Sequence, residues 1–324
     1  PGRIFIFDTS REAADSIKLL PGVKSCSPAK RLDPKIDVIR ENLPEVSGTF
    51  GVRVNTRDTD YSSEELERDF GSVIQEKTGE DVDLENPDTW VKVEISKKHA
   101  HIFTETFEGP GGLPASTQGH FLALISGGID SPVAAYQMMK RGTDITPIYF
   151  YNKPYAAEDH LIRFEKSVEK LRDFNLSKKW SYYIVDMEKA NKALKKVDSG
   201  RMVLHRRLMF EVADRIRKKR SLDGIVTGES ISQKSSQTPY NLATTSEGLN
   251  IFRPLLTWEK DDITHKAREI GTFQYSKIDS ACRTISPSSP STNMSFEELE
   301  ALKKEVGFED LVDDLVDSAE IREI

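Results

Sequence analysis

The sequence Phe121-Leu-Ala-Leu-Ile-Ser-Gly-Gly-Ile-Asp-Ser-Pro132 joins an apolar run directly to a polar, glycine-rich turn. The run 121–125 has the length and the flanking residues of a buried strand in a parallel sheet. Gly127 and Gly128 allow the chain to turn sharply and bring backbone N–H groups close to an anion, with no Cβ in the way. Parallel sheets bind ligands at the carboxyl ends of their strands, so we predict a phosphate-binding loop here.

The residues after this loop predict a helix that starts at the anion. Ser131 is placed as the N-cap and Pro132 as the first helical residue. The unpaired N–H groups and the positive dipole end of the helix would then face a bound pyrophosphate. The Gly-Lys-Ser/Thr ending of a Walker loop is absent, which disfavours P-loop kinase and GTPase chemistry. An ordinary strand–turn–helix is the alternative, but it does not explain the two hydroxyls and the carboxylate.

The composition predicts a globular protein of two or three domains. The chain has 324 residues, of which 37% are hydrophobic and 31% are charged. No apolar run approaches the roughly 18 residues of a membrane span and no signal peptide opens the chain, so we expect a cytoplasmic protein with no membrane partner. Residues 3–7 read as a strand already in progress, which suggests that residues upstream are missing.

The charge is unevenly distributed along the chain. The formal net charge of −7 disfavours strong general attraction to nucleic acid, but residues 153–220 contain 19 basic and 10 acidic side chains. A polyanion would meet this basic segment first, because residues 1–110 are net acidic. The alternative is that the basic residues form solvated helix faces.

The first third of the chain predicts a mixed α/β region. We expect a helix over 10–19, a short strand before residue 32, a helix from Asp33, a strand over 49–55, a helix over 62–78 and a hairpin of strands 90–95 and 99–105. The sequence Gly109-Pro-Gly-Gly-Leu-Pro114 then interrupts all periodicity, and we place a domain boundary there.

Beyond the boundary, strands alternate with helices. The expected strands are 121–125, 145–150, 182–186 and 224–227, and the expected helices are 132–141, 158–174 and 201–219. This alternation implies right-handed crossovers and a doubly wound parallel sheet, so the fold class is α/β. Residues 294–324 have helical apolar spacing, which predicts one or two closing helices.

The motif Ser126-Gly-Gly-Ile-Asp-Ser131 resembles the signature of the PP-loop ATP pyrophosphatases, which have the adenine nucleotide alpha hydrolase-like fold. With the blocks 227–238 and 253–260 and the region around Cys282, in this order, the chain is similar to the tRNA 4-thiouridine synthetase (ThiI) family. The resemblance implies a partial ferredoxin-like domain over 1–32, a THUMP RNA-binding domain over 33–108, a linker over 109–118, a PP-loop domain over 119–293 and C-terminal helices over 294–324.

The resemblance also implies a set of nucleotide-binding residues. They lie at strand ends, in the loop, on one helix and in a later polar segment: Leu124, Ile125, Ser126, Gly127, Gly128, Ser131, Tyr149, Phe150, Arg206, Gly228 and Gln237. An arginine neutralises phosphate charge, although Arg206 as an ordinary surface cation is the alternative. For the polar run 232–238 the alternative is a flexible loop.

Three residues are expected to take part in the chemistry. Asp130 would hold Mg²⁺ against the pyrophosphate through water or orient the loop, with a structural capping carboxylate as the alternative. Lys260 would stabilise the charge that develops as pyrophosphate leaves, or is a surface lysine at a helix start. Cys282 lies in a Ser- and Pro-rich loop beside Arg283, which favours the thiolate, and the family position makes it the sulfur-handling cysteine. Cys26 is expected to be a packing residue.

The reaction that the resemblance implies has two steps and uses ATP and Mg²⁺. The O4 atom of uridine 8 in tRNA is adenylated with release of pyrophosphate, and sulfur delivered through Cys282 then displaces AMP to leave 4-thiouridine. We expect a persulfide or sulfide donor, from a cysteine desulfurase or a separate rhodanese, because the chain has no rhodanese domain. Two cysteines without a CxxC also exclude an iron–sulfur cluster held by three cysteines of one chain. A homodimer is left open.

Three other interpretations remain open. A PP-loop amide synthetase that uses ammonia predicts a glutaminase partner and indifference to Cys282. An enzyme that supplies sulfur for the thiamine thiazole predicts a protein thiocarboxylate product. A non-catalytic THUMP tRNA-binding protein predicts RNA binding without ATP turnover, which the complete loop motif disfavours.

Overall fold

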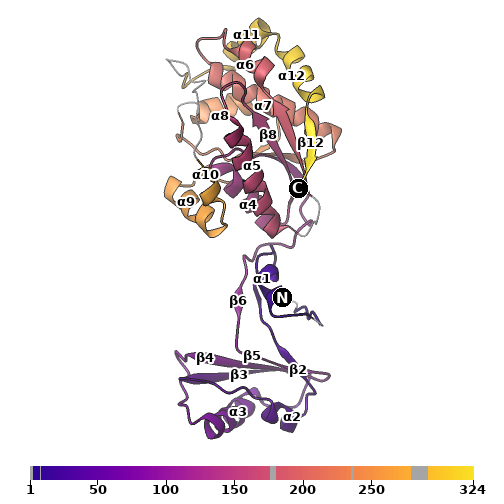
Figure 1. The fold of residues 1–324 in the computed structure, drawn as a ribbon, viewed down its shortest axis with the longest axis vertical. Coiled ribbons are helices and arrows are strands. Elements are labelled where there is room, and N and C mark those ends of the chain that lie inside the picture. The colour runs from indigo at the N-terminus through magenta and orange to yellow at the C-terminus, as the bar shows by residue number, and fades with distance from the viewer. Residues whose placement is uncertain (1–2, 8, 176–179, 235–236, 279–290) are drawn as a thin grey trace. The chain divides into compact units, whose positions relative to one another are not determined.

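The computed structural model describes residues 3–7, 9–175, 180–234, 237–278 and 291–324. The chain divides into two compact units, both drawn in Figure 1. Unit 1 comprises Pro1–Leu19 and Val23–Gly109, and unit 2 comprises Leu20–Gly22 and Pro110–Ile324. Within the described ranges, none of the helices has the length and apolar character needed to cross a bilayer.

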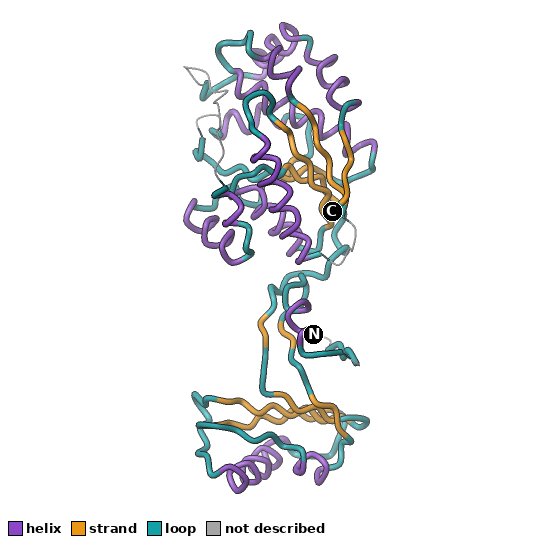
Figure 2. The backbone as a smooth tube through the Cα atoms, in the orientation of Figure 1, coloured by secondary structure: helices purple, strands orange, loops and turns teal. Residues whose placement is uncertain are grey.

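Unit 1 is built on a four-stranded sheet that two helices cover on one face (Figure 2). The strand order is β2 (Lys30–Leu32), β5 (Ala100–Phe103), β4 (Thr89–Ser96) and β3 (Phe50–Arg57). β3 and β4 are parallel, whereas β4 pairs antiparallel with β5, which confirms the predicted hairpin. The helices α2 (Ile36–Glu41) and α3 (Ser63–Thr78) bury Ile39, Phe70 and Ile74 in the core of this unit.

The N-terminal part of unit 1 differs from the prediction. The short helix α1 (Glu12–Ile17) is followed by β1 (Ser25–Cys26), which pairs antiparallel with β6 (Phe107–Glu108). The strand predicted over residues 3–7 is wrong, because no described strand pairs with this segment. Phe5 instead stacks on the ring of His101, with a centroid distance of 4.4 Å.

Unit 2 contains a six-stranded sheet that confirms the predicted doubly wound α/β fold. Its strand order is β11 (Ile251–Phe252), β10 (Gly224–Val226), β7 (His120–Leu124), β8 (Asp144–Tyr151), β9 (Ser181–Asp186) and β12 (Glu320–Glu323). The first five strands are parallel, and β12 pairs antiparallel with β9 at the edge. The edge strand β12 was not predicted.

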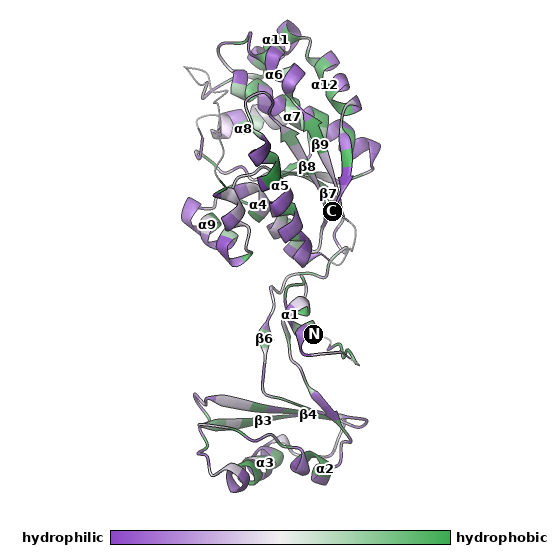
Figure 3. Cartoon of the chain, viewed as in Figure 1, coloured by the Kyte–Doolittle hydropathy of each residue, from purple (hydrophilic) through white to green (hydrophobic). Residues whose placement is uncertain are grey.

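The helices of unit 2 pack on both faces of this sheet. They are α4 (Asp130–Lys140), α5 (Glu158–Leu171), the 3₁₀ turn η1 (Arg172–Phe174), α6 (Glu188–Leu194), α7 (Arg201–Lys219), α8 (Pro239–Ser246), α9 (Lys260–Glu269), α10 (Phe273–Ser276), α11 (Phe296–Val306) and α12 (Phe308–Asp317). One core joins the sheet to α6, α7, α11 and α12 and contains Phe150. The adjacent Tyr149 points to the other face and stacks on Phe164 of α5, with a centroid distance of 4.8 Å. Figure 3 shows the apolar strands between these helices.

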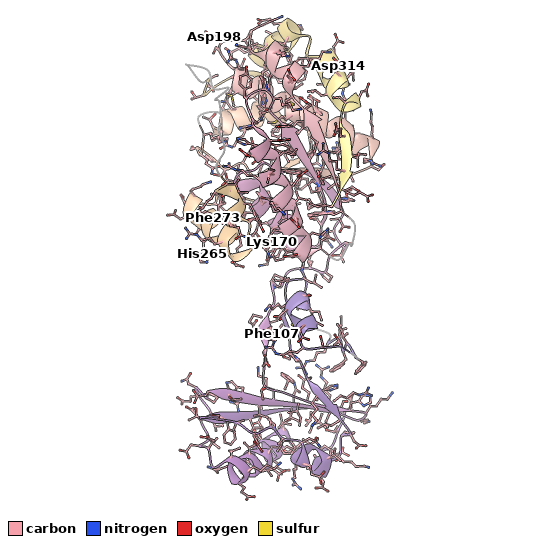
Figure 4. All side chains as sticks on the ribbon, viewed as in Figure 1. Phe107, Lys170, Asp198, His265, Phe273 and Asp314 are labelled. Carbon is pink, nitrogen blue, oxygen red and sulfur yellow. The ribbon has the colours of Figure 1, made fainter. Side chains whose placement is uncertain are left out.

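Part of the basic segment 153–220 is paired with acidic side chains of unit 2. Arg215 of α7 forms ion pairs with Glu309 and Asp313 of α12. Lys189 of α6 forms an ion pair with Asp314, which Figure 4 labels. The acidic helix α12 therefore neutralises part of the basic excess within unit 2.

Candidate functional site

The 126–131 loop is closed by the hydroxyls of its two serines. Ser131 Oγ accepts a hydrogen bond from the Ser126 backbone N–H at 2.8 Å and lies 3.0 Å from Ser126 Oγ. The Gly128 N–H donates to Ser126 Oγ at 3.3 Å. Helix α4 begins at Asp130, so the prediction of Ser131 as N-cap and Pro132 as first helical residue is wrong. The Ser131 hydroxyl binds back to the start of the loop instead of capping the helix.

Gly127 allows close packing of the loop against α5. Neither Gly127 nor Gly128 has a positive φ. A Cβ built on Gly127 would instead lie 2.9 Å from the Cβ of Arg163 on α5. Gly228, just after β10, approaches the loop in the same way, because its Cβ would lie 2.7 Å from Ser131 N. The structure thus brings Gly228 directly against the loop.

Asp130 and Lys260 form an ion pair across the site. Lys260 Nζ lies 2.6 Å from Asp130 Oδ1, although the two residues are 130 positions apart. Lys260 is the first residue of α9, which packs on α4. The ammonium is half-exposed and the carboxylate is mostly buried. Lys260 is therefore both a helix-start lysine and a cation at the loop.

The turn between α9 and α10 lies against Lys170, near the C-terminal end of α5. Gly271 has a φ of +74°, and its Cβ would lie 2.7 Å from the Cε of Lys170. Figure 4 labels Lys170 on α5 and Phe273 on α10. The chain that follows α9 therefore passes close to the side chain of Lys170 on α5.

Arg206 is part of a buried charge cluster and not a surface cation. Its Nε lies 2.9 Å from Glu229 Oε1, and the Nε of Arg253 lies 2.8 Å from Glu229 Oε2. All three side chains are 13% exposed or less. Burial lowers the pKa of Arg206, and the neighbouring Glu229 carboxylate opposes this effect. Two guanidinium groups share one carboxylate, so the three residues carry a net positive charge beside Gly228.

The strand-end residues contribute mainly packing and backbone. The Ile125 N–H donates to the Ile148 carbonyl at 3.0 Å, and Leu124 packs on the unit 2 core. The rings of Tyr149 and Phe150 are buried on opposite faces of the sheet. Both side chains are therefore packed inside unit 2, and the nucleotide contact expected at these two residues stays a prediction.

The buried side-chain oxygen of Gln237 has no donor in the part of the chain that the structure describes. The side chain is 5% exposed, and within the described ranges no donor reaches its Oε1. Its backbone is held by hydrogen bonds to Ser232 and Lys234. A buried unpaired acceptor is rare in native proteins, which makes Gln237 a candidate for contact with a bound molecule.

The structure describes Cys26 but not Cys282. Cys282 and Arg283 lie outside the described residues. Cys26 is a free thiol that donates to the Ala14 carbonyl at 3.5 Å, and burial raises its pKa. This environment fits the predicted packing role of Cys26.

No group of three or more His, Cys, Asp or Glu side chains suitable for a metal ion occurs in the described part of the chain. Asp130 is a single carboxylate, with Lys260 as its ion-pair partner. Mg²⁺ usually takes one or two protein carboxylates and completes its shell with substrate phosphates and water. Asp130 therefore fits a Mg²⁺ ion that arrives with ATP and does not fit a resident metal centre.

Sequence reasoning missed three residues around the loop. Glu229 and Arg253 lie inside the blocks 227–238 and 253–260, so a search for a buried counter-ion there would have suggested them. Arg163 carries no motif and is one of several cations on the amphipathic helix α5. Only its contact with Gly127 reveals it.

Comparisons with known proteins agree with this geometry. The model of the family "Thiamine biosynthesis protein (ThiI)" matches residues 116–308, and the THUMP domain model matches residues 36–105. The chain is 36% identical over 311 residues to a probable tRNA sulfurtransferase of Halobacterium salinarum, covering 92% of this chain and 79% of that protein. It is 34% identical over 310 residues to the corresponding protein of Methanothermobacter thermautotrophicus, covering 90% and 79%.

A solved structure resembles nearly the whole chain. It is a crystal structure of a 4-thiouridine synthetase–RNA complex with bound ATP. The TM-score is 0.89 at 27% sequence identity, and the match covers 99% of this chain and 87% of that chain.

Proposed function

Since the chain belongs to the ThiI family and contains a THUMP domain, we propose that it is an ATP-dependent tRNA sulfurtransferase that converts uridine 8 to 4-thiouridine. The observation that carries this proposal is the closed serine–glycine loop at the end of β7, with Asp130 and Lys260 paired on it at 2.6 Å. The relatives named as tRNA sulfurtransferases and the RNA complex with bound ATP support it.

In the first step, the 126–131 loop and the N-terminus of α4 bind the phosphates of ATP. The O4 atom of the uridine attacks the α-phosphorus, an O–P bond forms, and the bond to the β-phosphate breaks to release pyrophosphate. Bound Mg²⁺ supplies charge neutralisation to the phosphates, and Asp130 is the residue suited to hold it. Lys260 and the positive cluster of Arg206, Glu229 and Arg253 balance the negative charge of the leaving group. Positioning and electrostatics thus account for this step.

In the second step, sulfur replaces the activated oxygen. The outer sulfur of a persulfide on Cys282 attacks carbon 4, and the C–O bond breaks as AMP leaves. An external thiol then cleaves the S–S bond between this sulfur and Cys282, which releases 4-thiouridine and leaves Cys282 in a mixed disulfide that a second thiol reduces. The uridine is stacked inside folded tRNA, so we expect it to be turned out toward the ATP. We assign tRNA binding to unit 1, which contains the THUMP match. The sulfur donor, a homodimer and a cytoplasmic location stay predictions.

A second candidate function is sulfur supply for the thiamine thiazole. The family description "Thiamine biosynthesis protein" favours it. The same adenylation chemistry would then act on a protein carboxylate and give a thiocarboxylate. Mass spectrometry of the carrier protein after incubation with this chain, ATP and a sulfur donor distinguishes this product from 4-thiouridine.

The proposal predicts the behaviour of three variants in one assay. tRNA is incubated with the protein, Mg-ATP and a persulfide donor, and both pyrophosphate release and 4-thiouridine are measured. We expect Asp130→Ala to abolish pyrophosphate release, because the loop loses its only carboxylate. We expect Cys282→Ser to retain pyrophosphate release and lose thiolation.

The matched control is Lys266→Ala, on the same helix as Lys260 but paired with Glu269. Its activity should stay within twofold of the wild type. Undiminished thiolation by Cys282→Ser would contradict the assigned role of that cysteine. Pyrophosphate release without any 4-thiouridine from the wild type would contradict the proposed product.

A further inference from the structure

The first turns of α5 lie directly over the phosphate loop. A Cβ built on Gly127 would lie 2.9 Å from the Cβ and 3.1 Å from the Cδ of Arg163, and 3.3 Å from the carbonyl oxygen of His160. These distances are shorter than ordinary contacts of a Cβ atom. Position 127 therefore needs glycine because α5 approaches it, and Arg163 runs along the loop that is proposed to hold the phosphates.

Among the described residues, one donor of the Arg163 guanidinium has no acceptor. Its Nε is shielded from solvent, and no hydrogen-bond partner is found for it within the described ranges. Nε is bonded to the Cδ that touches Gly127, so this N–H group lies beside the loop. A second donor of the guanidinium binds the carbonyl of Ile278 and holds the side chain in place. The Nε2 atom of His160, one turn earlier on the same helix, is also buried and has no partner among the residues that the structure describes.

Among the described residues, the Nε–H group of Arg163 is a charged donor that a ligand could satisfy. The guanidinium is always charged, and a buried charged donor without a partner costs free energy. None of the described carboxylates forms an ion pair with Arg163, whereas Lys166 on the same helix is paired with Glu169. Among the described residues this cation has no carboxylate partner, and the planar fork of an arginine suits phosphate oxygens.

We propose that Arg163 is a further nucleotide-binding residue, whose Nε–H group donates to the β- or γ-phosphate, the part of ATP that leaves as pyrophosphate. This inference rests on the proposed function, because it requires ATP on the 126–131 loop. Gly127 is the second residue of the loop that is proposed to hold the phosphates, so its contact with Arg163 brings the donor beside that loop. Arg163 would also add positive charge where negative charge develops as the bond to the β-phosphate breaks.

Calorimetric titration of three ligands tests this assignment. The full chain is titrated with Mg-ATP, with pyrophosphate and with AMP. For Arg163→Gln we expect the Kd of ATP and of pyrophosphate to rise at least tenfold, while the Kd of AMP changes less than twofold. For Arg163→Lys, which keeps the charge, we expect part of the lost affinity to return.

Lys166→Gln is the matched control, because it removes one positive charge from the same helix without contact with the loop. Its three Kd values should stay within twofold of the wild type. Equal losses for AMP and pyrophosphate in Arg163→Gln would indicate a general structural defect and overturn the inference, as would no loss for either. A wild type that binds neither ATP nor pyrophosphate would contradict the proposed function itself.

Discussion

The imidazole of His205 is enclosed beside Arg206 on α7. Its Nε2–H group donates to Asn152 Oδ1 at 3.0 Å, and burial lowers its pKa from 6.5 to about 4. The folded state therefore binds this proton less readily than the unfolded state. The stabilisation is complete above pH 6.5 and is lost as the pH falls toward 4.

We predict that the free energy of unfolding falls by about 3 kcal/mol from this group between pH 6.5 and pH 4. His205→Gln keeps a donor for Asn152 but does not titrate, so its stability should depend less on pH over this interval. Urea unfolding of both proteins at several pH values measures the difference. Parallel pH profiles for the two proteins would show that His205 does not stay neutral in the folded state.

Gly228 is a second position at which a single added carbon atom is expected to change ATP binding. In Gly228→Ala the new Cβ meets the backbone of Ser131 at 2.7 Å, and backbone cannot move aside as a flexible side chain can. We predict that the loop shifts and that the Kd of ATP rises at least tenfold. Gly71→Ala is the control, because Gly71 lies in α3 with no atom near its Cβ position. Unchanged ATP affinity in Gly228→Ala would separate this glycine from the nucleotide site.

At the scale of elements, α12 is held to α7 by apolar burial more than by its ion pairs. Leu315 of α12 is 3% exposed in the unit 2 core, whereas Arg215 and its acidic partners lie at the surface. Leu315→Ala should lower the free energy of unfolding by about 2–5 kcal/mol. Arg215→Ala should lower it by less than about 1 kcal/mol, and less still at high salt. Urea denaturation measures both, and a larger effect of Arg215→Ala would contradict this ranking.

The sequence predicted best the elements whose bounds are set by residues within the element or directly beside it. Helix α7 was predicted over 201–219 and has these bounds, because its apolar periodicity and the preceding Gly200 lie within the segment. The observed bounds of β7, β8, β9 and β10 differ from the predicted bounds by at most one residue at each end. The edge strand β12 was not predicted, because its residues Glu320–Glu323 are all exposed and show no alternation. Its pairing with β9 depends on the fold and not on local sequence.

At the scale of the whole molecule, the sequence identified the segments that form the site but not the contacts between them. The motif around Asp130 and the block ending in Lys260 were both predicted to act on the leaving pyrophosphate, and the sheet brings them within 2.6 Å. The burial of Arg206 against Glu229 and the contact of Arg163 with Gly127 required the structure, since each joins segments distant in the chain. Buried counter-ions and unpaired donors depend on how distant segments pack together, so a sequence pattern alone does not reveal them.

The central claim is that this chain activates the uridine O4 atom by transferring AMP to it. Labelling that oxygen of uridine 8 with ¹⁸O and following the label through one turnover with ATP and a sulfur donor tests the claim directly. We predict that the label appears in AMP, because the C–O bond breaks after the oxygen has bonded to the α-phosphorus. Formation of 4-thiouridine with unlabelled AMP, or with the label in pyrophosphate, would contradict the account.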